Sequence, residues 1–204
     1  VWFTVGWDPQ QPAAPDAAQR DALSDLLRHP KAVAVGEVGL DYNFRPGYHE
    51  TPAAVQQQSF RAMLELAAEH RKPVVVHDRE AHQDVLAAIR DVPGSRGVMH
   101  CFTGDAEHAR RSIDVGFLVS FSGIVTFRNA EEIRGAARAV SSDRFVVETD
   151  APFLTPEPHR GSVNLPERVR DTARHVATIR GEAEAELCRR TTATAERLFA
   201  FELS

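Results

Sequence analysis

Apolar residues occur along this chain in short continuous runs rich in valine and alanine, and the segments between them repeat apolar positions at helical spacing. Continuous apolar runs are typical of strands that are buried on both faces of a parallel sheet. Helical spacing is typical of helices that cover such a sheet. The runs predict six strands, at residues 2–6, 32–37, 73–77, 97–101, 117–122 and 144–149.

Capping residues mark the helices between the runs. Asp16 with Gln19 three positions later has the spacing of a capping box, and Thr51-Pro52 has the pattern of an N-cap followed by a first-turn proline. Asp105 is an expected N-cap as well. The predicted helices cover residues 16–29, 53–71, 106–115 and 130–140, followed by two helices from Leu165 onward that are separated at Gly181.

Alternation of strands and helices predicts an α/β fold in which the strands pair in parallel through crossover connections. A doubly wound sheet and a closed eight-stranded TIM barrel both satisfy this pattern. Phosphate-cradling motifs of the types GxGxxG and GxxxxGK[ST] are absent from the sequence, which weakens the case for a nucleotide-binding sheet. Polar residues at the ends of four separate runs favour the barrel, whose chemistry collects at the ends of its strands.

Composition narrows the class of protein further. The chain has 204 residues, 43% of them apolar and 26% charged, which suits a single globular domain. No apolar stretch approaches the roughly 20 residues that cross a bilayer, and the two cysteines, Cys101 and Cys188, fit a reducing compartment. We therefore expect a cytoplasmic protein. A net charge of −5 argues against a protein that coats nucleic acid electrostatically, but not against an enzyme that holds one phosphate through metal ions.

Four residues of metal-binding type each end one of the apolar runs: Glu37, His77, His100 and Asp150. Carboxyl ends of parallel strands meet at one edge of a sheet or one end of a barrel, where active sites form. Two imidazoles and two carboxylates at such an edge are typical of a hydrolytic metal site.

Successive side chains of a strand point to opposite faces of the sheet, so the faces of the residues next to these four can be predicted. Cys101 is expected to point away from the site as a small packing residue. Glu148 shares the face of Asp150 one layer deeper, where Ser120 and Ser122 are candidate partners for its charge. Six other histidines are interpreted as satisfied or solvated polar residues on helices and loops: His29, His49, His70, His82, His108 and His175.

Five motifs in a fixed order resemble those of the TatD family of metal-dependent deoxyribonucleases, and the resemblance extends over essentially the whole chain. They are Gly36-Glu37-Val38-Gly39-Leu40-Asp41-Tyr42, Val76-His77-Asp78-Arg79-Glu80-Ala81, His100-Cys101-Phe102-Thr103-Gly104, Glu148-Thr149-Asp150-Ala151-Pro152-Phe153-Leu154-Thr155-Pro156 and His159-Arg160-Gly161-Ser162-Val163-Asn164-Leu165-Pro166.

This resemblance implies a TIM-barrel hydrolase of the amidohydrolase superfamily over residues 1–204, which cleaves DNA phosphodiester bonds, often from the 3′ end, with one or two divalent ions (Zn, Mn, Mg or Co). It implies that Glu37 bridges two metals, that His77 and His100 complete one of them, and that Asp150 binds the other and orients the attacking water. DNA would be the substrate, with no obligate protein partner.

The loop after the Asp150 strand supplies two further candidates. Arg160 and Asn164 lie on it, and in a barrel this loop is on the catalytic face. Arginine offers a planar fork that matches the oxygens of a phosphate. We therefore predict that both residues bind substrate; the competing interpretation is that Arg160 only pins the loop.

Two departures from the family pattern stand near the start of the chain. The family's first strand ends His-x-His, a spacing that no pair of histidines has here. The strand at 2–6 resembles the family's third, so we expect that the first two strand–helix units are missing and that six of eight strands remain. In the turn Gly6-Trp7-Asp8-Pro9, Asp8 replaces a family histidine, which puts a phosphate contact at that position in doubt.

Two other functions remain open at this point. The chain could be a catalytically impaired relative that binds metal or a partner without turnover. It could also hydrolyse a different ester or an amide, because one superfamily fold hosts many reactions.

Overall fold

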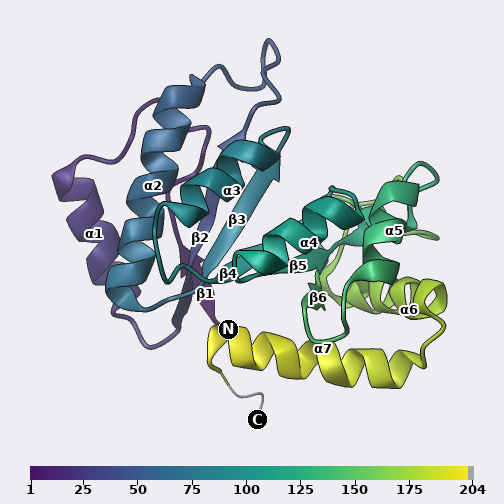
Figure 1. Cartoon of the computed structure of the whole chain (residues 1–204). Coiled ribbons are helices and arrows are strands. Elements are labelled where there is room, and N and C mark those ends of the chain that lie inside the picture. The colour runs from purple at the N-terminus through teal and green to yellow at the C-terminus, as the bar shows by residue number, and fades with distance from the viewer. Residues whose placement is uncertain (202–204) are drawn as a thin grey trace. The chain divides into compact units, whose positions relative to one another are not determined.

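Parallel strands joined by helices make up the part of the chain that the structure describes, residues 1–201 (Figure 1). The computed structural model divides these residues into two units, one of residues 1–99 with 198–201 and one of residues 100–197. Each unit is described by itself below. That residues 1–204 form one hydrolase domain stays a prediction.

The first unit is a parallel sheet with helices between its strands. Strands β1 and β2, β2 and β3, and β3 and β4 pair in parallel, so the strands follow the order of the chain. Helices α1 and α2 lie side by side along the sheet (Figure 1). The elements are β1 Phe3–Val5, α1 Ala17–Leu27, β2 Ala32–Asp41, α2 Ala53–His70, β3 Val74–Arg79, α3 His82–Arg90 and β4 Gly97–Met99.

The second unit repeats the same alternation. Strands β5 and β6 pair in parallel, and the fully buried rings of Phe121 and Phe145 contact each other across them at 5.6 Å between centroids. Helix α6 packs against β6 and α5. The elements are α4 Ala106–Asp114, β5 Phe117–Phe121, η1 Gly123–Thr126, α5 Glu131–Ala139, β6 Phe145–Val147, η2 Pro166–Arg168, α6 Val169–Arg180 and α7 Glu184–Phe199, whose last residues are assigned to the first unit.

All six predicted strands and all predicted helices are found in the described residues, with ends that differ by a few positions. Asp16 and Gln19 form the predicted capping box, and Asp105 caps α4 by accepting from the His108 amide. The cap predicted at Thr51 is wrong, because its hydroxyl donates to the Gln10 carbonyl instead and α2 begins without a side-chain cap.

Helix α3 has no counterpart among the predicted elements. Ala81 precedes its first turn, and alanine is not one of the capping residues, such as Asp16 and Asp105, that mark helix starts in the sequence. No helix among residues 1–201 combines the length and the apolar character that crossing a bilayer requires.

The prediction that the second strand ends at Glu37 is wrong, because β2 continues to Asp41. The register of β2 on β3 shifts between Val35 and Val38, where two residues of β2, Gly36 and Glu37, lie opposite one residue of β3. An extra residue of this kind is a β-bulge, and bulges re-aim a side chain near functional sites. Glu37 lies in the bulge and its side chain is 42% exposed, although most of β2 is buried.

Gly39 follows the bulge at a point where β2 and β3 approach closely. Its φ is +144°, and a Cβ added there would lie 2.1 Å from the carbonyl oxygen of His77. Both the backbone conformation and the space exclude a larger residue. The position of His77 therefore depends on glycine at this point of β2.

We predict that Gly39→Ala lowers the free energy of unfolding by about 2 kcal/mol or more, because β2 must move away from β3 and adopt a strained conformation. Gly135→Ala in helix α5 is the matched control, since an added Cβ meets nothing within 4 Å there. Alanine in a helix interior should stabilise by about 0.5–1 kcal/mol. Urea unfolding of both variants measures the two effects, and equal stability of the Gly39 variant and the parent would contradict this account.

Candidate metal centre

The bulge of β2 brings Glu37 to His77, the first pair of predicted ligands. Oε1 of Glu37 lies 2.7 Å from Nδ1 of His77, which is on β3. The imidazole is half-buried, with 24% of its side chain exposed. The structure therefore brings together the two predicted ligands of the first unit.

A third residue, Asp41, holds the other nitrogen of the His77 ring. Its Oδ2 lies 3.2 Å from Nε2, and its carboxylate also accepts from the amide of Asn43 and the hydroxyl of Tyr48. Asp41 is completely buried, and His49 approaches it at 3.5 Å. No role was predicted for Asp41 from the sequence, although it lies in the first of the five motifs, directly before Tyr42.

The pKa values of this group follow from its hydrogen bonds. Burial favours the neutral form of Asp41, but hydrogen bonds from His77 and Asn43 outweigh it and hold the pKa of Asp41 well below its usual range. Burial by itself would lower the pKa of His77, yet its hydrogen bonds to Asp41 and Glu37 and their negative charges raise that pKa to about 9. The first unit thus surrounds one imidazole with two carboxylates.

The second unit surrounds His100 in the same way. Nε2 of His100 lies 3.3 Å from Oδ1 of Asp150, and Nδ1 lies 2.9 Å from Oε1 of Glu148. Glu148 also accepts from the backbone amide of Cys101 and from the hydroxyl of Ser120. The predicted partnership of Glu148 with Ser120 is therefore confirmed, and its contact with His100 adds a role that the sequence did not reveal.

The directions predicted for Cys101 and Ser122 need correction. Ser122 contacts Cys101, with 3.2 Å between its hydroxyl oxygen and the sulfur, and no bond to Glu148 is found for it among the described residues. Strand β4 ends at Met99, and Cys101 has a positive φ of 44°. Strand alternation therefore does not apply to Cys101, which belongs to the polar surroundings of His100 rather than to a purely apolar packing layer.

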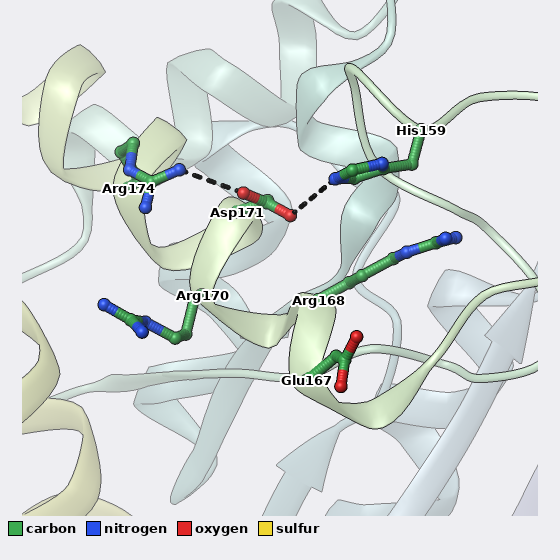
Figure 2. A pocket seen from close by; sticks show the side chains of 6 residues that line it. All are labelled: His159, Glu167, Arg168, Arg170, Asp171 and Arg174. Carbon is green, nitrogen blue, oxygen red and sulfur yellow. Dashed lines mark hydrogen bonds and ion pairs between the residues drawn. The ribbon is translucent and has the colours of Figure 1, made fainter.

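Several other histidines have defined partners. His82, interpreted from the sequence as solvated, lies 2.9 Å from the buried carboxylate of Asp78 in the first unit. In the second unit His159 lies 3.3 Å from Asp171, whose other oxygen accepts from Arg174 at 3.0 Å. Figure 2 shows Asp171 between these two side chains, in an open hollow with Arg168 and Arg170.

The two predicted substrate-binding residues lie in the second unit but in different surroundings. Arg160 is exposed, and its guanidinium lies 3.7 Å from the centre of the Phe127 ring. Asn164 is 2% exposed, and its side-chain nitrogen donates to the carbonyls of Thr149 and Phe153. Asn164 thus braces the turn around Asp150, and a substrate-binding role for either residue stays a prediction.

The donor atoms fit divalent ions. Two ligands that are each about 2.1 Å from one ion lie roughly 3 Å apart, and the Glu37–His77 and His100–Asp150 distances of 2.7 and 3.3 Å are of this size. Mixed imidazole and carboxylate donors suit Zn, Mn and Co, and with more water Mg. Each histidine also has a second carboxylate of the kind that orients metal-binding imidazoles.

Comparisons with known proteins agree with this chemistry. Residues 1–200 match the family model described as TatD related DNase. The chain is 50% identical over 184 residues to the metal-dependent hydrolase YcfH of Escherichia coli K12, which covers 89% of this chain and 68% of that protein. It is 34% identical over 212 residues to the 3′-5′ ssDNA/RNA exonuclease TatD of Klebsiella pneumoniae, covering 100% of this chain and 78% of that protein.

A solved structure gives the same result. YJJV, a TatD homologue from Escherichia coli K12, matches with a TM-score of 0.89 and 25% identity, over 98% of this chain and 77% of that one. This likeness confirms the α/β fold of TIM-barrel type that the sequence predicts.

We predict that Glu148→Gln weakens metal binding about 10- to 100-fold, because it removes the negative charge that holds the His100 imidazole while its amide keeps the same shape. Competition with a chromogenic chelator measures the affinity. Glu131→Gln, on an exposed part of α5, is the charge-matched control and should leave affinity unchanged. If Glu148→Gln lowers the melting temperature and leaves metal affinity unchanged, Glu148 only stabilises the fold, one layer deeper than Asp150.

Proposed function

This chain belongs to the TatD-related DNase family of metal-dependent hydrolases, and we propose that it hydrolyses phosphodiester bonds of DNA, removing nucleotides from the 3′ end. The observation that carries the proposal is the pair of histidines, each with a carboxylate at ligand distance, in a chain that is 34% identical over its whole length to a named 3′-5′ exonuclease. Cys101 and Cys188 are not in a disulfide, which supports the proposal of a cytoplasmic location.

We propose that Glu37, His77, His100 and Asp150 are the metal ligands. When bound, divalent ions (Zn, Mn, Mg or Co) would supply a Lewis acid that lowers the pKa of water toward about 7 and counters the charge of the phosphate. Of the two carboxylates beside His77, Glu37 is 42% exposed and Asp41 is completely buried, which supports the proposal that Glu37 would hold the ions and Asp41 the imidazole.

Residues of the chain orient the two imidazoles and the attacking water. Asp41 and Glu148 hold the rings of His77 and His100 from the side away from Glu37 and Asp150. Asp150 accepts a proton from the attacking water and directs its lone pair to phosphorus. Its φ of 59° places this carboxylate at a turn just after β6, and such strained conformations are common at active sites.

Two other functions remain as alternatives. An impaired relative would bind metal without turnover, and a hydrolase of another ester or amide would use the same ligands. A metal-loaded preparation that binds ions but cuts neither DNA nor a simple ester would favour the first. Rapid ester or amide cleavage without DNA cleavage would favour the second.

We expect Asp150→Asn to slow DNA hydrolysis about 10²- to 10⁴-fold, because the amide keeps the shape of the side chain but cannot take the proton from water. Release of nucleotides from a 3′-labelled strand measures the rate under saturating metal. Asp143→Asn is the control, since Asp143 is 66% exposed before β6. Near-normal hydrolysis by the Asp150 variant would exclude its proposed role.

A separate prediction concerns Arg160, which we propose contacts a substrate phosphate. Arg160→Ala should raise KM for a short DNA strand and flatten the salt dependence of binding, because one phosphate contact is lost. Its contact with Phe127 is exposed and contributes about 0.5–1 kcal/mol, so the melting temperature should change little. If instead Arg160→Ala and Phe127→Leu lower the melting temperature alike and leave KM unchanged, the residue only pins its loop.

A further inference from the structure

The loop between β2 and α2 exposes two large aromatic side chains. Phe44 is 48% exposed and Tyr48 is 45% exposed, although the loop starts directly after the buried Asp41. Single exposed apolar residues are ordinary in proteins. Here both rings contact His49, with 5.6 Å between the centroids of Phe44 and His49 and 5.0 Å between those of Tyr48 and His49. The two rings therefore form a defined local surface.

Hydrogen bonds and ring contacts hold this surface in place from beneath. The Tyr42 hydroxyl donates to Asp84 at 2.8 Å and accepts from Gln57 at the same distance. The Phe44 ring stacks on that of Tyr42, with 5.8 Å between centroids and 18° between planes. Phe44 is thus supported by a fixed partner, and little conformational freedom is lost when a ligand binds.

A hollow of about 470 Å³ lies beside the Phe44 ring. Its size falls in the range of small-molecule binding sites, about 300–1,000 Å³. It is lined by Phe44, Arg45, Pro46, His49, Glu50 and Pro52, and all of these residues belong to the first unit. Apolar rings together with a few charged groups are the usual lining of such a site.

Positive charge accompanies the aromatic surface. Arg45 follows Phe44 and is exposed. The guanidinium of Arg79 lies 5.4 Å from the centre of the Tyr48 ring and 4.0 Å from the Asp41 carboxylate. Arg79 also donates to the Tyr48 hydroxyl at 3.3 Å. Flat rings beside arginines suit a ligand that carries a flat base and an anionic phosphate.

This surface is joined to the candidate metal centre. The Tyr48 hydroxyl donates to Asp41, and Asp41 holds His77. Two hydrogen bonds, from Tyr48 to Asp41 and between Asp41 and His77, thus connect the loop to a candidate ligand. The proposed metal chemistry therefore has an adjacent surface that can hold the base of the nucleotide.

We propose that Phe44 and Tyr48, with Arg45 and Arg79, form a binding site for an unpaired nucleobase of the DNA strand. This proposal rests on the proposed function and adds a contact to the base rather than to the phosphate. Bases of a duplex are stacked on each other and cannot reach such a surface, whereas an unpaired base can stack on Phe44.

The test measures binding without cleavage. Fluorescence anisotropy of a labelled single strand, with a chelator present, compares the parent protein with Phe44→Ala. Stacking of one base contributes about 1–3 kcal/mol, so affinity should fall about 5- to 150-fold. Phe44→Trp should restore it, and Leu26→Ala, which removes another exposed apolar side chain from helix α1, should not change it. Unchanged melting temperatures confirm that the variants fold.

An abasic strand of the same length and charge identifies the contact. Parent protein should bind it more weakly than the normal strand, and Phe44→Ala should cause no further loss. Equal losses on both strands, no loss on either, or failure of the parent to bind the single strand would each overturn the nucleobase site.

Cleavage of the same strand by metal-loaded parent protein is measured separately. Cleavage together with binding that is independent of Phe44 would reject the nucleobase site and leave the proposed function standing. Binding that depends on Phe44 without cleavage would reject the proposed function and leave the site standing.

Discussion

A carboxylate that is removed from water must be surrounded by hydrogen-bond donors, and the completely buried Asp41 imposes this requirement on the whole first unit. An uncompensated buried charge costs several kcal/mol. The donors come from three places: the imidazole of His77 on β3, the amide of Asn43 and the hydroxyl of Tyr48. The Asp41 carboxylate therefore helps to position His77, Asn43 and Tyr48, which come from a strand and from the loop after β2.

Glu148 meets the same requirement in the second unit with a different set of residues. Its donors are the amide of Cys101, the hydroxyl of Ser120 and the ring of His100. Ser120 is on β5 and Glu148 follows β6, so the pairing of these two strands decides whether the group forms. The two units share no residue of these clusters, yet each holds one imidazole between two carboxylates. This is the arrangement that fixes the orientation of a histidine where it binds a metal.

The strands could be predicted from the sequence because they depend on local pattern: apolar runs decide where strands form. The candidate ligands follow from their positions at the ends of those runs, and their binding of metal stays a prediction. The bulge around Glu37 could not be predicted, since a register shift depends on the partner strand and not on the period of β2. Asp41 and Glu148 were underestimated for a related reason: a carboxylate's role depends on donors that are distant in sequence, such as Tyr48 and Ser120. Cys101 was misplaced because β4 ends earlier than its apolar run suggests.

The hydrogen bonds of Asn164 determine when the loop around Asp150 becomes ordered. Its side chain joins the carbonyls of Thr149 and Phe153, and its amide donates to the carbonyl of Pro152, so the excursion from 149 to 164 is closed at its neck around Asp150. Closing a loop of this length has an entropic cost that rises only slowly with length. That cost falls on the folding of the second unit, and the Asp150 carboxylate is already ordered when a substrate arrives.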